Sequence, residues 1–205
     1  MLVIPHLFLK NKKSAIPAEG RPVWFSEDPL VLSKTFADSG AEQLFITDSN
    51  IPGAAKSENV DIIEKIISSC NLPVLVSGNF RSIESAEPYF QIGVDKIILG
   101  APAYQDPDFL KSACQKFKGK IAVHIQVRDK KVFIPGWIAP SHKTVLDYAE
   151  RFEEQGISAF CYAEEKFETI QDFCLKTKRW VYALSDPQNL QGLEPYAKIP
   201  SSYFR

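Results

Sequence analysis

The chain has 205 residues, of which 45% are hydrophobic, and its formal net charge at neutral pH is −1. This length and apolar fraction predict a single domain, residues 1–205, with a sizeable core. Lys and Glu residues are interspersed and form no basic stripe, which argues against binding of nucleic acid. No apolar run reaches the roughly 18 residues that a membrane span needs. The short N-terminal apolar run predicts a strand rather than a signal peptide, and four separated cysteines favour a cytoplasmic protein.

Short β-branched and aromatic runs alternate along the chain with longer segments of helical period, which is typical of βα units. The predicted strands lie near residues 2–9, 43–48, 73–77, 95–100, 120–127, 158–163, 179–184 and 199–204. The predicted helices lie near residues 28–39, 59–69, 82–91, 106–117, 141–155, 166–177 and 188–197. Two helix starts are marked by an N-cap residue before a proline, at residues 26–29 and 106–107. Three helix ends are marked by a glycine that predicts a left-handed C-cap: Gly40, Gly93 and Gly156. Residues 130–137 predict a short excursion such as a hairpin.

Three segments of the chain return in the same order. Residues 6–13 are echoed by 124–131, residues 36–40 by 152–156, and residues 83–89 by 190–196. The echoes predict two related halves, about 1–118 and about 119–205, of four elements each. Eight strands in two equivalent halves favour a TIM-like (βα)8 barrel, with an open doubly wound sheet as the alternative. Because few residues follow the last echo, we expect the final βα unit to be truncated.

At these residues the chain resembles the histidine-biosynthesis isomerase family, which consists of half-barrel-duplicated enzymes that isomerise a bis-phosphorylated aminoimidazole carboxamide ribotide. The resemblance covers nearly the whole length, and its strength lies in the order and spacing of motifs that are individually weak. The matching segments are Leu2 to Lys10, Asp28-Pro29, Phe36 to Asp48, Gly53-Ala54, residues 73–82, Gly93-Val94-Asp95, residues 98–100, Arg128-Asp129, Gly136-Trp137 and Arg151 to Gly156.

The resemblance implies an Amadori rearrangement, formally an intramolecular oxidoreductase reaction, run by two aspartates at the ends of strands one and five. The matching positions in this chain are Phe8 and Gln126, and a family threonine or serine late in strand six is matched by Ala163. Neither phenylalanine nor glutamine can transfer a proton at ordinary pH. We therefore expect the family isomerisation to be lost, so that enzymatic activity is itself in question.

The resemblance also implies two phosphate sites, one in each half, where glycine-rich turns direct backbone N–H groups at the anion. The first half keeps this pattern, and the matching turn of the second half, Ser185-Asp186-Pro187, places an acidic residue there. We therefore expect a small, singly phosphorylated metabolite as the ligand. Its predicted phosphate-binding residues are Ser77, Gly78, Asn79, Arg81, Gly100 and Ala101.

Four further residues form related pairs: His6 with His124, and Asp48 with Glu164. Strand parity points both histidines into the barrel, where they could form a new acid–base centre with Asp48 or Glu164 as an orienting or replacing carboxylate. The alternative is a structural plug of the two histidines and Phe8, because buried polar residues need partners more often than they catalyse. These four residues lie on four strands without a tight local pair, so we predict no metal and no cofactor.

The C-terminal region is rich in aromatic residues where a final helix is expected to be missing. An unfinished eighth unit would leave a sheet edge and uncover apolar side chains, which favours a homodimer through the strand seven–eight region. The candidates for that surface are Leu2, Trp180, Tyr182, Tyr203 and Phe204. Two functions stay open: a barrel that handles a phosphorylated metabolite, and a catalytically silent barrel that acts as a binding or subunit protein.

Overall fold

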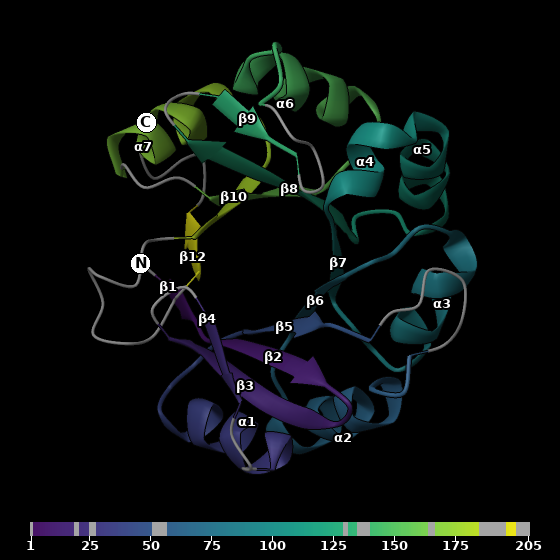
Figure 1. Ribbon diagram of the computed structural model, residues 1–205, viewed down its shortest axis with the longest axis vertical. Helices are drawn as coiled ribbons and strands as arrows, with labels where there is room; N and C mark the ends of the chain where they lie inside the picture. The colour runs from purple at the N-terminus through teal and green to yellow at the C-terminus, as the bar shows by residue number, and fades with distance from the viewer. Residues whose placement is uncertain are drawn as a thin grey trace.

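Parallel strands alternate with helices, as the sequence predicts, in a computed structural model that describes residues 2–18, 21–24, 28–50, 57–128, 131–134, 140–163, 167–184 and 196–199. Seven of the described strands run parallel to their neighbours around a ring (Figure 1). They are β2 (His6–Lys10), β5 (Leu44–Asp48), β6 (Val74–Gly78), β7 (Lys96–Leu99), β8 (Ile121–Arg128), β10 (Ala159–Ala163) and β11 (Trp180–Leu184). The predicted TIM-like α/β barrel is confirmed.

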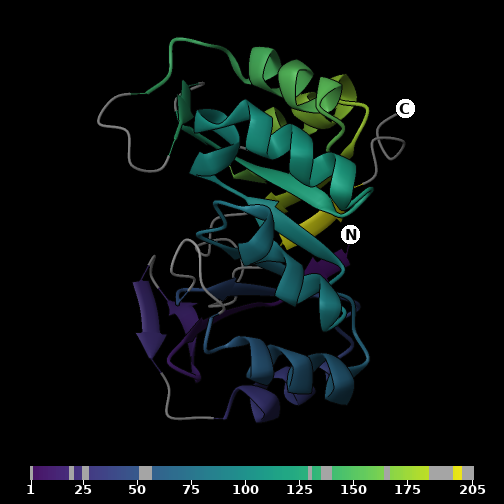
Figure 2. The same cartoon turned by 90° about the vertical axis from the view of Figure 1, so that its right-hand side faces the viewer.

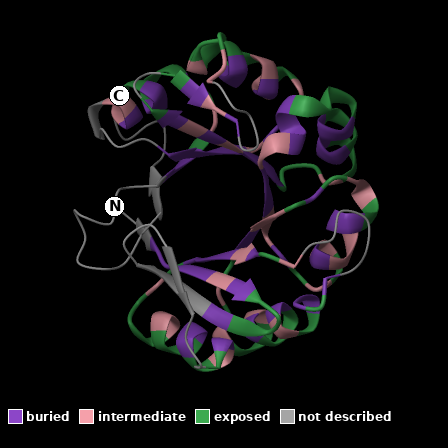
Figure 3. Ribbon diagram, in the orientation of Figure 1, coloured by how far each residue is buried: buried purple, intermediate pink, exposed green. Residues whose placement is uncertain are grey.

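The helices cover the outside of this ring, and their buried faces point at the strands (Figure 3). Asp28 caps the first helix through Leu30 N and Asp106 caps the fifth through Phe109 N, each with proline in the first turn, as predicted. The helices are α1 (Pro29–Asp38), α2 (Val60–Cys70), α3 (Ile83–Gln91), α4 (Ala101–Gln105), α5 (Pro107–Lys116), α6 (Val145–Glu154) and α7 (Phe167–Lys176). The short α4 was not predicted.

The ring is closed by a strand of opposite direction. β12 (Tyr196–Ile199) pairs antiparallel with β11 on one side and with β1 (Leu2–Ile4) on the other, and only Pro5 separates β1 from β2. The predicted helix 188–197 is therefore wrong at Tyr196 and Ala197, and the remaining residues 188–195 lie outside the described residues. A parallel connection needs about a dozen or more residues, and only residues 185–195 separate β11 from β12. An antiparallel return is the connection that fits this length.

The sheet edge predicted at the eighth unit is therefore not open. β12 supplies backbone hydrogen-bond partners to both β11 and β1. Tyr182 is not on an outer surface either. It is 1% exposed and lies in an apolar layer inside the barrel, since its strand parity matches that of Cys161, its neighbour on β10. The inner layer consists of Ile4, Phe45, Leu75, Ile98, Ala122, Ala159, Cys161 and Tyr182. A larger apolar cluster fills the space between strands and helices.

In each half, the first parallel strand is followed by an excursion, that is, a segment that turns back and pairs antiparallel with that strand. β2 continues into β3 (Lys13–Ala18) and β4 (Arg21–Trp24), and β8 continues into β9 (Lys131–Phe133). The second agrees with the hairpin predicted from residues 130–137 over the described residues 131–134, whereas the first was not predicted. Both excursions project from the end where the parallel strands finish (Figure 2). The repeated segments 6–13 and 124–131 thus each begin in a parallel strand that pairs with an antiparallel strand following it in the chain.

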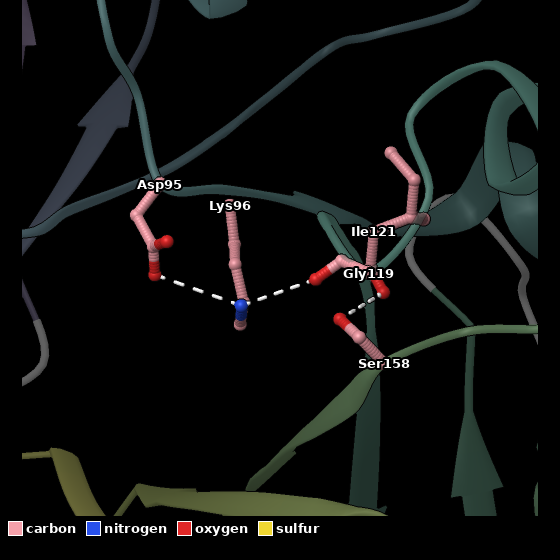
Figure 4. A network of polar contacts seen from close by, with 5 residues as sticks. All are labelled: Asp95, Lys96, Gly119, Ile121 and Ser158. Carbon is pink, nitrogen blue, oxygen red and sulfur yellow. Dashed lines mark hydrogen bonds and ion pairs between the residues drawn. The ribbon is translucent and has the colours of Figure 1, made fainter.

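Polar contacts tie the strands together at the opposite end of the barrel (Figure 4). Lys96, the first residue of β7, donates to the Gly119 carbonyl at 3.2 Å and lies 3.6 Å from the Asp95 carboxylate. Ser158 donates through its hydroxyl to the Ile121 carbonyl at 2.9 Å. These contacts join the starts of β7, β8 and β10. They therefore stabilise the end of the barrel opposite to the carboxyl ends of the strands, where barrels of this kind carry their functional groups. In the described part of the chain, no helix has the length and apolarity that a membrane crossing needs.

Candidate functional site

A cavity of about 470 Å³ opens at the carboxyl ends of the parallel strands. Side chains from strands β2, β5, β6, β7, β8 and β10 reach it, together with the turns that follow β6 and β7. In barrels of this kind the ends of the strands carry the functional groups, so the position of the cavity fits a binding site. Its lining residues are His6, Phe8, Phe45, Thr47, Ser77, Gly78, Asn79, Arg81, Ile98, Gly100, Ala101, Pro102, His124 and Cys161.

All six residues predicted to bind phosphate line this one cavity. Ser77 and Gly78 end β6, and Gly100 precedes α4, so two adjacent strands deliver their turns to the same place. The Arg81 Nε atom donates to the Asn79 Oδ1 atom at 2.8 Å, which orients the guanidinium group at the rim. Among the described lining residues, Arg81 carries the only formal charge at neutral pH. The electrostatics of this rim therefore favour an anion.

His6 lies in the interior of the barrel next to two aromatic rings. The ring centroids of Phe8 and Phe45 are each 4.3 Å from that of His6. The His6 Nε2 atom is 2.8 Å from the Thr47 hydroxyl, which in turn is 2.8 Å from the Ser77 hydroxyl. Burial, with a smaller contribution from nearby His124, lowers the pKa of His6 to about 3. At neutral pH this imidazole is uncharged and takes part in a chain of hydrogen bonds.

His124 lines the cavity from β8, beside Cys161 on the adjacent strand. Burial lowers its pKa to about 4, so this imidazole is also neutral near pH 7. Its backbone carbonyl accepts a hydrogen bond of 2.8 Å from the Tyr104 hydroxyl, which fixes the strand at this point. Its Nε2 atom is buried without a hydrogen-bond partner among the described residues. The structure thus brings His6 and His124 to one cavity, as parity predicts.

The two positions that match the family aspartates have different surroundings. Phe8 lines the cavity and packs against His6. Gln126 pairs with Phe133 of the β8–β9 hairpin and with Ala163 of β10, and it is not among the residues that line the cavity. Neither side chain can donate or accept a proton as a carboxyl group does.

Asp48 faces away from the cavity, contrary to the proposed partnership with the histidines. Leu44 and Ile46, which share its parity on β5, belong to the outer core, whereas Phe45 and Thr47 point inward. The Asp48 carboxylate is 2% exposed and accepts hydrogen bonds from Tyr89 Oη at 2.6 Å, from Asn59 Nδ2 at 2.8 Å and from the backbone N–H of Asn50 at 2.8 Å. These bonds hold the carboxylate on the outer side of β5, and Glu164 lies outside the described residues.

Sequence reasoning missed Thr47, Phe45, Ile98, Pro102 and Cys161 as lining residues. Thr47 is the most informative omission, because it lies beside Phe8 on one neighbouring strand and beside Ser77 on the other. The alternation of residues 44–48 was the available signal, since it turns Thr47 to the side occupied by Phe45. In the described part of the chain, no cluster of three or more His, Cys, Asp or Glu side chains has a metal-binding arrangement.

The fold and the position of the cavity define a (βα)-barrel protein whose site lies at the carboxyl ends of the strands. Comparison with known sequences is more specific: the model of the histidine biosynthesis protein family matches residues 2–165. The chain belongs to this family.

Similar proteins include three bacterial ones named 1-(5-phosphoribosyl)-5-((5-phosphoribosylamino)methylideneamino)imidazole-4-carboxamide isomerase. The protein from Bradyrhizobium sp. strain BTAi1 is 32% identical over 80% of this chain and 68% of its own length. The protein from Burkholderia ambifaria strain MC40-6 is 35% identical over 80% of this chain and 67% of its own. The protein from Pseudomonas syringae pv. tomato is 34% identical over 85% of this chain and 73% of its own.

Proposed function

We propose that this barrel binds a small, singly phosphorylated metabolite in the cavity at its mouth and does not catalyse the isomerisation for which its relatives are named. The observation that carries the proposal is the meeting of two strand-end turns and Arg81 in one cavity. Ser77 and Gly78 approach from β6, and Gly100 and Ala101 approach from the adjacent β7. Turns of this kind offer backbone N–H groups to a phosphate, and Arg81 adds a positive charge.

A single phosphate fits the charge of this cavity better than two. The relatives' name describes a substrate with two phosphoribosyl groups. The described lining residues of this chain include one cation, Arg81, and it stands at the β6 turn. The sequence of the corresponding turn in the second half contains Asp186, which would repel a second phosphate.

The residues at the two family positions support the loss of the parent reaction. Phe8 and Gln126 stand at the positions of the family aspartates and have no titratable group. His6 and His124 are too weakly basic near pH 7 to replace them, because efficient acid–base catalysis needs a pKa close to the operating pH. Asp48 is engaged on the outer side of β5. The alternative, new acid–base chemistry by the two histidines with Asp48 or Glu164, therefore has less support.

Substitution of Arg81 tests the phosphate site. Arg81→Ala should weaken binding of inorganic phosphate and phosphate monoesters roughly tenfold to a hundredfold, since a charge-assisted hydrogen bond contributes about 1.5–3 kcal/mol. Isothermal titration calorimetry measures the change. Lys34→Ala is the matched control, because Lys34 is an exposed cation in a separate groove between α1 and α2. Equal phosphate affinity of the Arg81→Ala protein and the wild type would contradict the proposal.

A second candidate function is a catalytically silent subunit that associates through the strand seven–eight region. The observation in its favour is Trp180, which is 46% exposed at the start of β11, whereas Tyr182 on the same strand is buried. Large exposed aromatic side chains often anchor contacts between subunits. If this candidate is correct, the wild type sediments as a homodimer at micromolar concentration and Trp180→Glu shifts it to a monomer. A monomeric wild type would exclude this association.

A further inference from the structure

Two turns that are far apart in the sequence are connected by buried contacts. The first is the rim turn, residues 78–81, which lines the cavity with every residue except Phe80. The second is the turn of the β2–β3 hairpin, Asn11-Lys12, which follows the strand that brings His6 and Phe8 to the cavity. The contacts between these turns come from α3 and from the end of β5.

Phe80 belongs to the core between strands and helices rather than to the cavity wall. It is fully buried, and its ring meets the ring of Tyr89 edge-on, with the centroids 5.0 Å apart and the planes at 84°. Edge-to-face packing favours one mutual orientation of two aromatic rings. Phe80 stands between Asn79 and Arg81, whose side chains are joined by a hydrogen bond of 2.8 Å. The position of the Phe80 ring therefore affects where these two side chains lie.

Tyr89 connects Phe80 to a buried carboxylate. It lies on the buried face of α3, a helix that begins directly after the rim turn with Ser82 as its N-cap. The Tyr89 hydroxyl donates to the Asp48 Oδ2 atom at 2.6 Å. Burial and the Asp48 carboxylate raise the pKa of Tyr89 above its usual value, so the hydroxyl stays protonated and remains a donor.

The same carboxylate reaches the hairpin turn through two asparagines. Its Oδ1 atom accepts from the Asn59 side chain and from the Asn50 backbone N–H. The side-chain oxygens of Asn59 and Asn50 accept in turn from the backbone N–H groups of Lys12 and Asn11. A continuous series of contacts thus runs from the rim turn through Tyr89 to the hairpin turn.

We propose that Tyr89 is a positioning residue, whose ring sets the rim turn and whose hydroxyl sets the hairpin turn. This inference rests on the proposed function, since phosphate binding is one of its two readouts. Loss of the hydroxyl leaves the buried carboxylate without one of its donors, and such an acceptor moves toward another partner. The two asparagines and the hairpin turn shift with it, and the Tyr89 ring loses the bond that fixes it beside Phe80.

Tyr89→Phe tests this role, because it removes the hydroxyl and keeps the ring. Hydrogen exchange of the Asn11 and Lys12 amides should accelerate about tenfold, as measured by nuclear magnetic resonance at pH 7. Affinity for inorganic phosphate should fall about threefold to tenfold by calorimetry, as the loss of one hydrogen bond predicts. Tyr148→Phe is the matched control, because it removes a buried tyrosine hydroxyl that lies 2.8 Å from the Ser141 hydroxyl in the second half. The control should retain the wild-type affinity and exchange rates.

Phe80→Leu separates the two parts of the role and does not depend on the folding of Tyr89→Phe. It removes the edge-on ring contact and keeps the bond between Tyr89 and Asp48. Phosphate affinity should therefore fall by a similar factor, whereas the hairpin amides should exchange at the wild-type rate.

The outcomes separate this inference from the proposed function. Phosphate binding that depends on Arg81 but is equal in the wild type, Tyr89→Phe and Phe80→Leu would overturn the role at the rim turn and leave the proposed function intact. Hairpin amides that exchange at the wild-type rate in Tyr89→Phe, or equally fast in Tyr148→Phe, would overturn the role at the hairpin turn. A wild type that binds no phosphate would overturn the proposed function together with the role at the rim turn.

Discussion

His6 and His124 place two imidazoles inside the barrel that are uncharged near pH 7. The pKa of His6 is lowered to about 3 and that of His124 to about 4, in each case chiefly by burial. An unfolded histidine titrates near pH 6.5, so the folded and unfolded chains bind different numbers of protons below that pH. The unfolded chain takes up the protons first. Protein stability therefore falls as the pH drops from about 6.5 toward 4, where the folded histidines begin to protonate.

This difference predicts a measurable slope of stability against pH. Each buried histidine should lower the free energy of unfolding by up to about 1.4 kcal/mol per pH unit below pH 6.5. Urea unfolding at pH 7.5, 6 and 5 measures the slope, and His124→Gln should reduce it. His142→Gln is the control, because His142 is the third histidine of the chain and is exposed. A slope that is the same in His124→Gln and in the wild type would show that burial does not keep this imidazole neutral.

The β2–β3 hairpin continues β2, whose His6 and Phe8 line the cavity, and Asp48 holds its turn in place. Its two-residue turn consists of Asn11 and Lys12, both with positive φ, at 50° and 61°. Asn59 accepts from the Lys12 N–H at 2.8 Å and Asn50 accepts from the Asn11 N–H at 2.9 Å. Since Asp48 binds both asparagines, the carboxylate connects β5 to the hairpin turn.

Removal of this carboxylate should be strongly destabilising. Asp48→Ala leaves the buried donors of Tyr89 and Asn59 without their acceptor, at a cost of about 1–3 kcal/mol each, so the free energy of unfolding should fall by about 3 kcal/mol or more. Urea unfolding at pH 7.5 provides the measurement. Glu64→Ala on the exposed face of α2 should change the stability by less than about 0.5 kcal/mol. A similarly small effect of Asp48→Ala would argue that the network contributes little.

The same elements show how far the sequence predicts the fold and where it does not. The parallel strands and most helices follow from local patterns and from caps such as Asp28-Pro29. The first hairpin was missed because Asn11-Lys12 contains no glycine to mark a turn with positive φ. The direction of β12 depends on backbone pairing with both β1 and β11, which no local pattern reveals.

The candidate site was likewise predicted in part from the sequence. The turns proposed to bind phosphate were predicted because glycine, serine and arginine cluster after two strands. The predicted residues line one cavity, and phosphate binding there stays a prediction. The predicted orientation of Asp48 was wrong, because Asp48 shares the strand parity of Leu44 and Ile46, which face the outer core. Thr47, two residues from Phe45, shares the inward face and takes the place proposed for Asp48 near the histidines.

At the scale of the whole molecule, the two halves repeat a strand and hairpin but contribute unequally to the cavity. The first half supplies most of the lining residues, through β2, β5, β6, β7 and the segments that follow β6 and β7. Only His124 and Cys161 among the described lining residues come from the second half. The proposed phosphate site lies in one half, and the two positions of the family carboxylates hold Phe8 and Gln126, which is why we propose binding without rearrangement of a ribotide.

Genetic complementation directly tests the proposed loss of the isomerisation. The wild-type gene should not restore growth without histidine to a bacterial strain that lacks the pathway isomerase. The double variant Phe8→Asp with Gln126→Asp should not restore it either, since the sequence of the second half places Asp186 in the second phosphate turn. Growth supported by the wild type would mean that other groups have taken over the acid and base roles.

The central claim, one anion site at the carboxyl ends of β6 and β7, is tested most directly by nuclear magnetic resonance. Inorganic phosphate titrated into the ¹⁵N-labelled protein should shift the amide signals of Gly78, Gly100 and Ala101 along one saturable binding curve, because these residues line the cavity beside Arg81. The signals of Ser185 and Asp186 should not follow that curve. Saturable shifts confined to Ser185 and Asp186, or none at Gly78 and Gly100, would contradict the account.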